Sequence, residues 1–192
     1  MVAMTRYHPE DKEKTRRKIL AVAARRYRAE GLNEVGIANL MADLGLTHGG
    51  FYAHFADKEA LVAAVCNSAF SAQIDRWHKL LHNHSDRPAR EVIVRDYLSD
   101  AHLHHPETGC LAAAVAGEMA RRDTPSRQAF TNGIKALLGQ LRQEDPGIAP
   151  EVTLALMLGA VTLARAVSDQ ALSERFLTSA YQVLLDPEAP PR

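Results

Sequence analysis

The sequence has few cysteines, few strand signals, no net charge and no long apolar run. Its two cysteines, Cys66 and Cys110, lie far apart and without CxxC spacing, so we expect reduced thiols and no disulfide framework. No stretch approaches the roughly 20 apolar residues that span a bilayer, and the N-terminus lacks the apolar core of a signal peptide. These absences favour a cytoplasmic protein that does not enter a membrane.

Strand signals are scarce along the whole chain. Alternating apolar and polar runs are few, and alanine and leucine are abundant, which favours helices over strands. At 192 residues the chain can bury a real core, and it fits one compact unit or two small ones. The predicted fold class is all-α.

The zero net charge at first argues against a nucleic-acid partner, but the distribution of charge reverses that interpretation. Residues 1–28 carry nine Lys or Arg and three acidic residues, whereas residues 59–192 carry thirteen basic and sixteen acidic residues. A basic segment before a mildly acidic body suits DNA binding that weakens as salt rises. For some of these charges a solvated helix face is the alternative. Arg17 is the candidate DNA contact in this segment.

Residues 36–58 predict two short helices joined by a glycine turn. The first helix has one apolar face at helical spacing, formed by Ile37, Leu40, Met41 and Leu44. Gly45 follows, where a helix end needs a residue that tolerates positive φ, and Thr47 is a good N-cap for a second helix near residues 48–54. Two helices joined in this way form a helix-turn-helix, whose second helix enters the major groove of DNA.

The outer face of the second helix carries two glycines, Gly49 and Gly50. Each lowers helix propensity by roughly 1 kcal/mol relative to alanine. Either the missing side chains let the backbone approach a phosphate or a base edge, or they let the helix pack tightly against its neighbour. The polar side chains that can contact DNA here are Thr47, His48, Tyr52, His54 and Lys58.

Gly31 and the stretch GIANLMADLGLTHGGFYAHFADKEAL (residues 36–61) resemble the DNA-binding domain of the tetracycline-repressor (TetR/AcrR) family. The resemblance is most specific from Gly45 to Leu61. It implies core roles for Phe51, Phe55 and Leu61, and DNA-contact roles for Thr47, Gly49, Tyr52, His54 and Lys58. Gly36 stands where many members have a Thr or Ser cap, so the first short helix is expected to be weakly capped.

The resemblance also implies the domain organisation. A three-helix N-terminal helix-turn-helix DNA-binding domain (residues 1–57) would precede a helical C-terminal ligand-binding and dimerisation domain (residues 58–186). Residues 187–192 are expected to be disordered. Apolar and polar periodicity places the helices near residues 11–30, 57–81, 88–103, 110–122, 124–143, 151–168 and 172–185.

The last two helices are apolar almost all round, which exceeds what one buried face needs. A partner chain explains the excess, since two helices from each of two chains would form an intermolecular bundle; a wholly internal helix pair is the alternative. Binding to two DNA half-sites also requires a dimer. The predicted interface residues are Leu154, Met157, Leu158, Val161, Phe176 and Tyr181.

Residues 105–118, HPETGCLAAAVAGE, resemble one subgroup of the family, whose effectors are mixed. Three polar residues amid apolar surroundings are candidate effector contacts. Cys110 follows a glycine at an expected helix N-terminus, which can lower a thiol pKa; a small buried apolar role is the alternative. Glu118 faces a pocket or pairs with a nearby arginine. Arg165 binds a ligand carboxylate, crosses the dimer interface or pairs with Asp169 one turn on.

Six histidines form two groups in the sequence: His78, His82 and His84, then His102, His104 and His105. His78 and His82 have the i, i+4 spacing of zinc ligands, but no nearby Cys or Glu completes a familiar site, and surface histidines are the alternative.

The function that we expect is a dimeric transcriptional regulator, a repressor released from palindromic double-stranded operator DNA by a small-molecule effector. No enzymatic activity, cofactor or metal is expected. The alternatives are a helical-bundle metal protein or enzyme that uses these histidines, and a DNA-associated scaffold without a ligand cavity.

Overall fold

The computed structural model describes residues 9–144 and 148–185, and these residues form helices and no strand. An N-terminal unit consists of α1 (Pro9–Glu30), α2 (Ile37–Ala42) and the 3-10 helix η1 (His48–Ala53). The predicted all-α class is confirmed. The other elements are α3 (Lys58–Asn83), α4 (Ala89–Tyr97), α5 (Asp100–His104), η2 (Pro106–Thr108), α6 (Leu111–Met119), α7 (Thr124–Glu144), α8 (Pro150–Ala166) and α9 (Gln170–Leu185).

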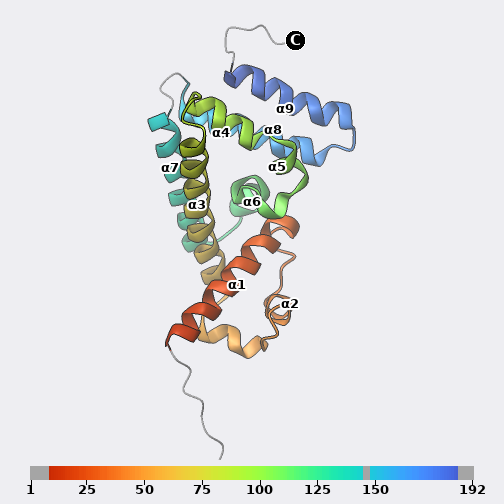
Figure 1. The fold of residues 1–192 in the computed structure, drawn as a ribbon. Coiled ribbons are helices and arrows are strands. Elements are labelled where there is room, and N and C mark those ends of the chain that lie inside the picture. Colours follow the sequence, from red (N-terminus) through yellow and green to blue (C-terminus); the bar gives the residue numbers. More distant parts are fainter. Residues whose placement is uncertain (1–8, 145–147, 186–192) are drawn as a thin grey trace, which may run out of the picture.

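The helices give the molecule an elongated shape, with the N-terminal unit at one end and α8 and α9 at the other (Figure 1). The long helices α3 and α7 lie side by side between the two ends, and α6 lies near the C-terminal end of α1. The directions of α3 and α7 follow from two contacts. The Ser126 hydroxyl donates to the Glu59 carboxylate near the start of both helices, and His78 bonds Gln140 near the end of both. The two helices are therefore parallel.

Close packing between α3 and α7 depends on Gly133. The ring of Phe70 lies directly over this glycine, so that a Cβ at position 133 would overlap it. Phe130 lies one turn before Gly133, and its ring meets that of Phe70 edge to face at 5.5 Å. Helices α3 and α7 thus form a closely packed pair in the middle of the molecule.

One continuous apolar core connects the N-terminal unit to the body. Ile19, Ala23 and Tyr27 of α1 are fully buried, as their spacing predicts. They share the core with Leu61 of α3 and Val115 of α6. Within residues 9–144 and 148–185, none of the helices combines the length and the apolar character that crossing a bilayer requires.

The single helix predicted for residues 88–103 is wrong, because the chain breaks after Leu98 into α4 and α5. Ser99 causes the break. Its hydroxyl accepts the N–H of His102 at 3.2 Å as the cap of α5, and it donates to the Asp96 carbonyl at 2.8 Å. A serine in this position competes with the helix for backbone groups.

Two further expectations concern short segments. The second helix of the helix-turn-helix is a 3-10 helix, not an α-helix, and it ends at Ala53. Short 3-10 segments are frequent as connectors between helices, and the two glycines lower the α-helix propensity of this one. Residues 187–192, for which disorder was expected, lie outside the described residues, as do the first eight residues of the basic segment.

Candidate nucleic-acid interface and internal cavity

The turn between α2 and η1 is built as its sequence predicts. Gly45 has a φ of +66°, and its N–H donates to the Ala42 carbonyl at 2.9 Å. The Thr47 hydroxyl caps η1 by accepting the Gly50 N–H at 3.2 Å. Gly36, by contrast, caps α2 without any side-chain hydrogen bond, as expected. The turn therefore fixes the direction of η1 relative to α2.

Two stacked phenylalanines hold the inner face of η1. Phe51 and Phe55 are buried, and their ring centroids lie 5.5 Å apart. Arg16 of α1 supports them: its guanidinium lies 4.2 Å from the centre of the Phe55 ring, and it also donates to the His54 carbonyl. Helix α1 thus supports η1 indirectly, through a cation–π contact between Arg16 and the Phe55 ring that stacks on Phe51.

The basic residue that contacts the segment directly after η1 is Arg16, whereas Arg17 was predicted as the DNA contact. Arg17 is exposed and lies 4.0 Å from the Glu13 carboxylate on its own helix. The signal that distinguishes the two was present in the sequence. Arg16 precedes the buried residues Ile19 and Ala23 by three and seven positions, which places it on the inward face of α1.

The outer face of η1 is open. Tyr52 is 55% exposed, and its ring meets the His48 ring edge to face at 5.6 Å. Thr47, His48 and Gly49 are exposed beside it. A Cβ at Gly49 would have no heavy atom within 4 Å. The structure thus brings together an aromatic hydroxyl, an imidazole and a bare stretch of backbone on one short helix.

Two predicted DNA contacts, His54 and Lys58, are less open. His54 has a half-buried ring, and its Nδ1 atom has no hydrogen-bond partner among the described residues. Burial and the nearby Lys12 and Arg16 charges lower the pKa of His54. Lys58 donates to the Asn33 carbonyl at 3.3 Å, and burial lowers its pKa. Both side chains are thus less exposed than Tyr52 and His48, and their predicted contacts with DNA stay predictions.

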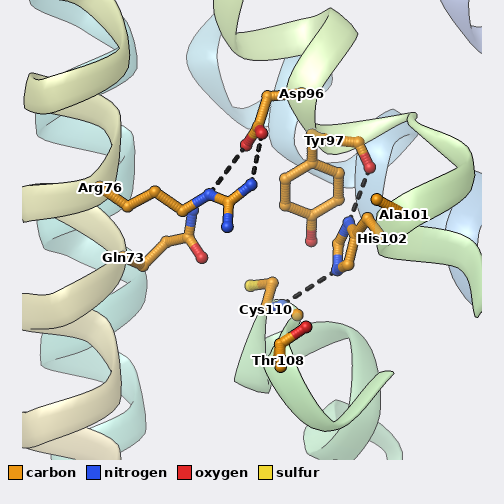
Figure 2. A pocket seen from close by; sticks show the side chains of 9 residues that line it. Gln73, Arg76, Asp96, Tyr97, Ala101, His102, Thr108 and Cys110 are labelled. Atoms are coloured by element: carbon orange, nitrogen blue, oxygen red, sulfur yellow. Dashed lines mark hydrogen bonds and ion pairs between the residues drawn. The ribbon is translucent and has the colours of Figure 1, made fainter. Parts of the chain in front are cut away.

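A narrow cavity of about 50 Å³ lies in the C-terminal body between α3, α4, α5 and α6 (Figure 2). The Cys110 thiol lines it, and the hydroxyl of Tyr97 points toward Cys110. The Tyr97 hydroxyl is buried and has no hydrogen-bond partner among the described residues. Burial, and then the neighbouring Cys110 thiol, raise the pKa of Tyr97 well above its ordinary value. Arg76 pairs with Asp96 on the opposite wall.

His102 organises the floor of the cavity. Its Nδ1–H donates to the Tyr97 carbonyl at 2.7 Å, and its Nε2 accepts the backbone N–H of Cys110 at 3.0 Å. These two contacts require a neutral ring with the proton on Nδ1, and burial lowers the pKa of His102 accordingly. A Cβ at Gly109 would overlap the ring. Nothing in the sequence analysis singled out Tyr97 or His102 for this cavity.

The three predicted effector contacts are not brought together. Cys110 lines the cavity. Arg165 lies close by, where it donates to the carbonyls of His102 and Leu103 and borders an open groove of about 750 Å³. It does not pair with Asp169, whose carboxylate accepts the Leu172 N–H instead.

Glu118 lies away from the cavity, at the far end of α6. Its carboxylate accepts the backbone N–H groups of Leu32 and Asn33. The sequence offered two alternatives: that Glu118 faces a pocket, or that it pairs with Arg121 or Arg122. The structure shows neither, because the carboxylate binds backbone N–H groups instead.

The residues predicted for the dimer interface differ in burial. Leu154, Met157 and Val161 are buried in the core of their own chain. Leu158, Phe176 and Tyr181 are only partly buried. Periodicity alone could not distinguish the two faces of α8, because both are apolar.

The histidines of the described residues do not gather into a metal site. Among the described residues, no group of three or more His, Cys, Asp or Glu side chains could hold a metal ion. His78 bonds Gln140 at 2.9 Å, and both ring nitrogens of His102 are engaged as described above. His82, His84, His104 and His105 are exposed.

The glycine turn, the capped second helix and its open outer face define a helix-turn-helix unit, the supersecondary structure whose second helix enters the major groove of DNA. Residues 19–65 match the family model described as bacterial regulatory proteins, tetR family. The segment that contains the helix-turn-helix is thus similar to the DNA-binding part of the TetR family, whose members are DNA-binding transcriptional regulators.

Solved structures show the same fold along nearly the whole chain. The reduced form of NemR from E. coli is 23% identical, with 90% of this chain and 96% of that chain covered and a TM-score of 0.75. A TetR-family regulator from Agrobacterium tumefaciens is 18% identical, with coverages of 89% and 97% and a TM-score of 0.75. A TetR regulator from Chloroflexus aurantiacus is 23% identical, with coverages of 92% and 97% and a TM-score of 0.73. A search of curated proteins found no match.

Proposed function

We propose that the chain is a homodimeric repressor that reads two half-sites of a palindromic operator with η1 and is released by a small-molecule effector. The observation that carries the proposal is the open face of η1, where Tyr52, His48 and the bare backbone at Gly49 project from a rigidly supported helix. Groups of this kind contact phosphates and base edges. We assign the chain no enzymatic activity.

The distribution of exposed apolar side chains supports the dimer. Four large hydrophobic residues are exposed among the described residues. Tyr52 lies on η1, and Val152, Leu163 and Val183 lie on α8 and α9, exposed by 52%, 48% and 44%. We therefore place the second chain against α8 and α9 and divide the protein into a DNA-binding domain (residues 1–57) and an effector-binding and dimerisation domain (residues 58–186).

The cavity beside Cys110 and Tyr97 is the proposed entry point of the effector. At about 50 Å³ it is far smaller than the roughly 300 Å³ at which ligand pockets usually begin. The effector must therefore be small, or it must bind a conformation in which the cavity is wider. An effector that prefers such a state shifts the population away from the DNA-binding one by its differential affinity.

Binding to DNA upstream of the chain's own coding sequence tests the proposal. Sequence-specific binding is expected at low salt, with an affinity that falls steeply as salt rises. Absence of sequence-specific binding at low salt would exclude the proposed function. Substitution of Tyr52 by Ala is expected to weaken binding without unfolding the chain, and unchanged affinity would remove Tyr52 from the interface.

Chemical modification of Cys110 is a second candidate signal, because its thiol lines the cavity. Cys66 provides an internal control, since burial raises its thiol pKa to about 12 and keeps it protonated at neutral pH. Both thiols are buried, but Cys110 lines the cavity and Cys66 does not. With the intact protein and iodoacetamide, we therefore expect Cys110 to be alkylated faster than Cys66, as measured by peptide mass mapping. Release from DNA by alkylation should persist in Cys66→Ser and disappear in Cys110→Ser. Equal alkylation rates would assign Cys110 a purely structural role.

A further inference from the structure

Glu118 joins the C-terminal body to the DNA-binding unit through the backbone. It lies in the last turn of α6, and its two oxygens accept the N–H groups of Leu32 and Asn33 at 2.9 and 3.0 Å. These two groups follow α1, the helix that braces η1. A carboxylate that receives two backbone N–H groups makes charge-assisted bonds, which are roughly twice as strong as neutral ones.

The chain is shaped to admit this carboxylate. Gly31 ends α1 with a φ of +87°, a conformation that favours glycine. A Cβ at this position would lie 2.6 Å from Glu118 Oε1. Gly31 therefore serves two needs at once: it turns the backbone so that the next two N–H groups converge, and it leaves room for the group that binds them.

Arg122 reinforces the same connection from the turn after α6. Its guanidinium is largely buried, and it donates to the Glu59 carboxylate and to the Asn33 side chain, both at 2.7 Å. The other Glu59 oxygen accepts the Ser126 hydroxyl of α7 at 2.6 Å. One arginine thus connects the loop after α1 to the first turn of α3, the helix that follows η1.

The short helix α6 places these contacts opposite the cavity. It begins directly after Cys110 in the cavity wall and ends beside Glu118, a length of about 13 Å at 1.5 Å per residue. Figure 1 shows it close to the C-terminal end of α1. The helix α6 is therefore the element that connects the cavity wall to the contacts of Glu118 with the loop after α1.

We propose that Glu118 and Arg122 are positioning residues that set the angle of the DNA-binding unit on the body, and thereby the spacing of half-sites that the dimer accepts. This inference rests on the proposed function, because spacing has meaning only for a dimer that reads two half-sites. The two residues touch no DNA. Their effect is exerted through the loop at residues 31–33, which holds α1 and, through Arg16, η1.

The test measures spacing preference directly. Paired half-sites are first selected from random duplex DNA with the wild-type chain, and duplexes are then made with the centres moved by one or two base pairs. We expect wild type to favour one spacing by about tenfold and Glu118→Ala to reduce that preference to about twofold. Affinity for a single half-site at low salt should be unchanged, since the outer face of η1 is intact. Fluorescence anisotropy reports both affinities.

Glu91→Ala is the matched control. Glu91 also pairs with an arginine, Arg95, at 2.7 Å, but both lie on α4 and connect nothing to the DNA-binding unit. It should keep the wild-type spacing profile, whereas Arg122→Ala should lose it. If Glu118→Ala does not fold, Glu118→Gln decides the matter: it keeps the length of the side chain but turns an amide N–H toward a backbone N–H.

The outcomes distinguish the two proposals. A folded Glu118 variant that keeps the wild-type spacing profile would overturn the positioning role and leave the proposed function standing. A wild-type chain that selects no paired site would overturn both. The positioning role would be established if Glu118→Ala and Arg122→Ala both reduced the preference for one half-site spacing without changing the affinity for a single half-site, and Glu91→Ala did not.

Discussion

Gly49 and Gly50 are neighbours in η1, yet side chains added at the two positions would meet different surroundings. A Cβ at Gly49 would meet no heavy atom within 4 Å, whereas one at Gly50 would lie 3.4 Å from the Thr47 hydroxyl oxygen. Tight packing within the chain therefore does not account for Gly49. The interpretation that remains is an unobstructed backbone that DNA can approach closely.

Gly49→Ala separates stability from binding. Alanine has the higher helix propensity, so the free energy of unfolding should stay unchanged or rise by up to about 1 kcal/mol. DNA affinity should fall by about tenfold, because the added methyl group occupies the surface that faces the duplex. Chemical denaturation and a DNA titration measure the two effects.

Gly45→Ala is the control for backbone strain. Gly45 has a φ of +66°, so alanine here should lower the free energy of unfolding by about 1 kcal/mol. A Gly49→Ala variant that binds DNA as tightly as wild type would remove this glycine from the interface.

At the scale of elements, α7 offers two glycines in contrasting surroundings. Gly133 lies under the Phe70 ring, where a Cβ would overlap it, whereas a Cβ at Gly139 would meet nothing within 4 Å. Gly133→Ala should lower the free energy of unfolding by about 1–3 kcal/mol through overpacking. Gly139→Ala should raise it by up to about 1 kcal/mol through helix propensity. Urea denaturation measures both, and equal effects would show that α3 and α7 tolerate separation.

The floor of the cavity should make stability depend on pH. Burial lowers the pKa of His102 below its ordinary value of 6.5, so the unfolded chain binds this proton more readily than the folded one. The stabilisation is complete above about pH 6.5 and is lost as the pH falls below it. Protonation also removes the acceptor of the Cys110 N–H.

His102→Gln tests this titration. The variant should be less stable than wild type at pH 8, because it lacks the imidazole that bonds both the Tyr97 carbonyl and the Cys110 N–H. It should also show a smaller loss of stability between pH 6.5 and pH 5 than wild type. His54, whose pKa is lowered too, accounts for part of the slope that remains. Thermal unfolding across this pH range measures the difference, and an unchanged slope would exclude His102 as its source.

How far the sequence predicts an element depends on how local its causes are. Gly45 and Thr47 act on groups within five residues of themselves, and each forms the turn or cap that its type indicates. Asp57 acts as locally, because its carboxylate accepts the Ala60 N–H as the N-cap of α3. The break at Ser99 has an equally local cause, but the apolar periodicity of residues 92–98 outweighed it in the prediction. The site was less predictable, because Tyr97 and His102 acquire their roles only where α4, α5 and α6 meet.

At the scale of the whole molecule, the second chain is expected on the outward face of α8 and α9. Leu163→Glu should produce a monomer that keeps its helical content, because Leu163 is 48% exposed and a charge there opposes burial by a partner. Sedimentation velocity and circular dichroism measure the two properties.

Met157→Ala is the contrasting variant on the same helix. Met157 is fully buried within its own chain, so the substitution should lower the free energy of unfolding by about 2–5 kcal/mol. Lys135→Glu, an exposed change on α7, should leave the assembly unchanged. A Leu163→Glu chain that still dimerises would place the interface on another face.

The sequence by itself determined the all-α class, the helix-turn-helix and the residues at its turn, because helical periodicity, caps and positive-φ glycines act over a few residues. Only the tertiary structure decided which apolar face of α8 is internal. It also decided that Glu118 binds backbone groups 85 and 86 positions away. Such partners depend on how helices pack against one another in three dimensions, and no local spacing in the sequence records that arrangement.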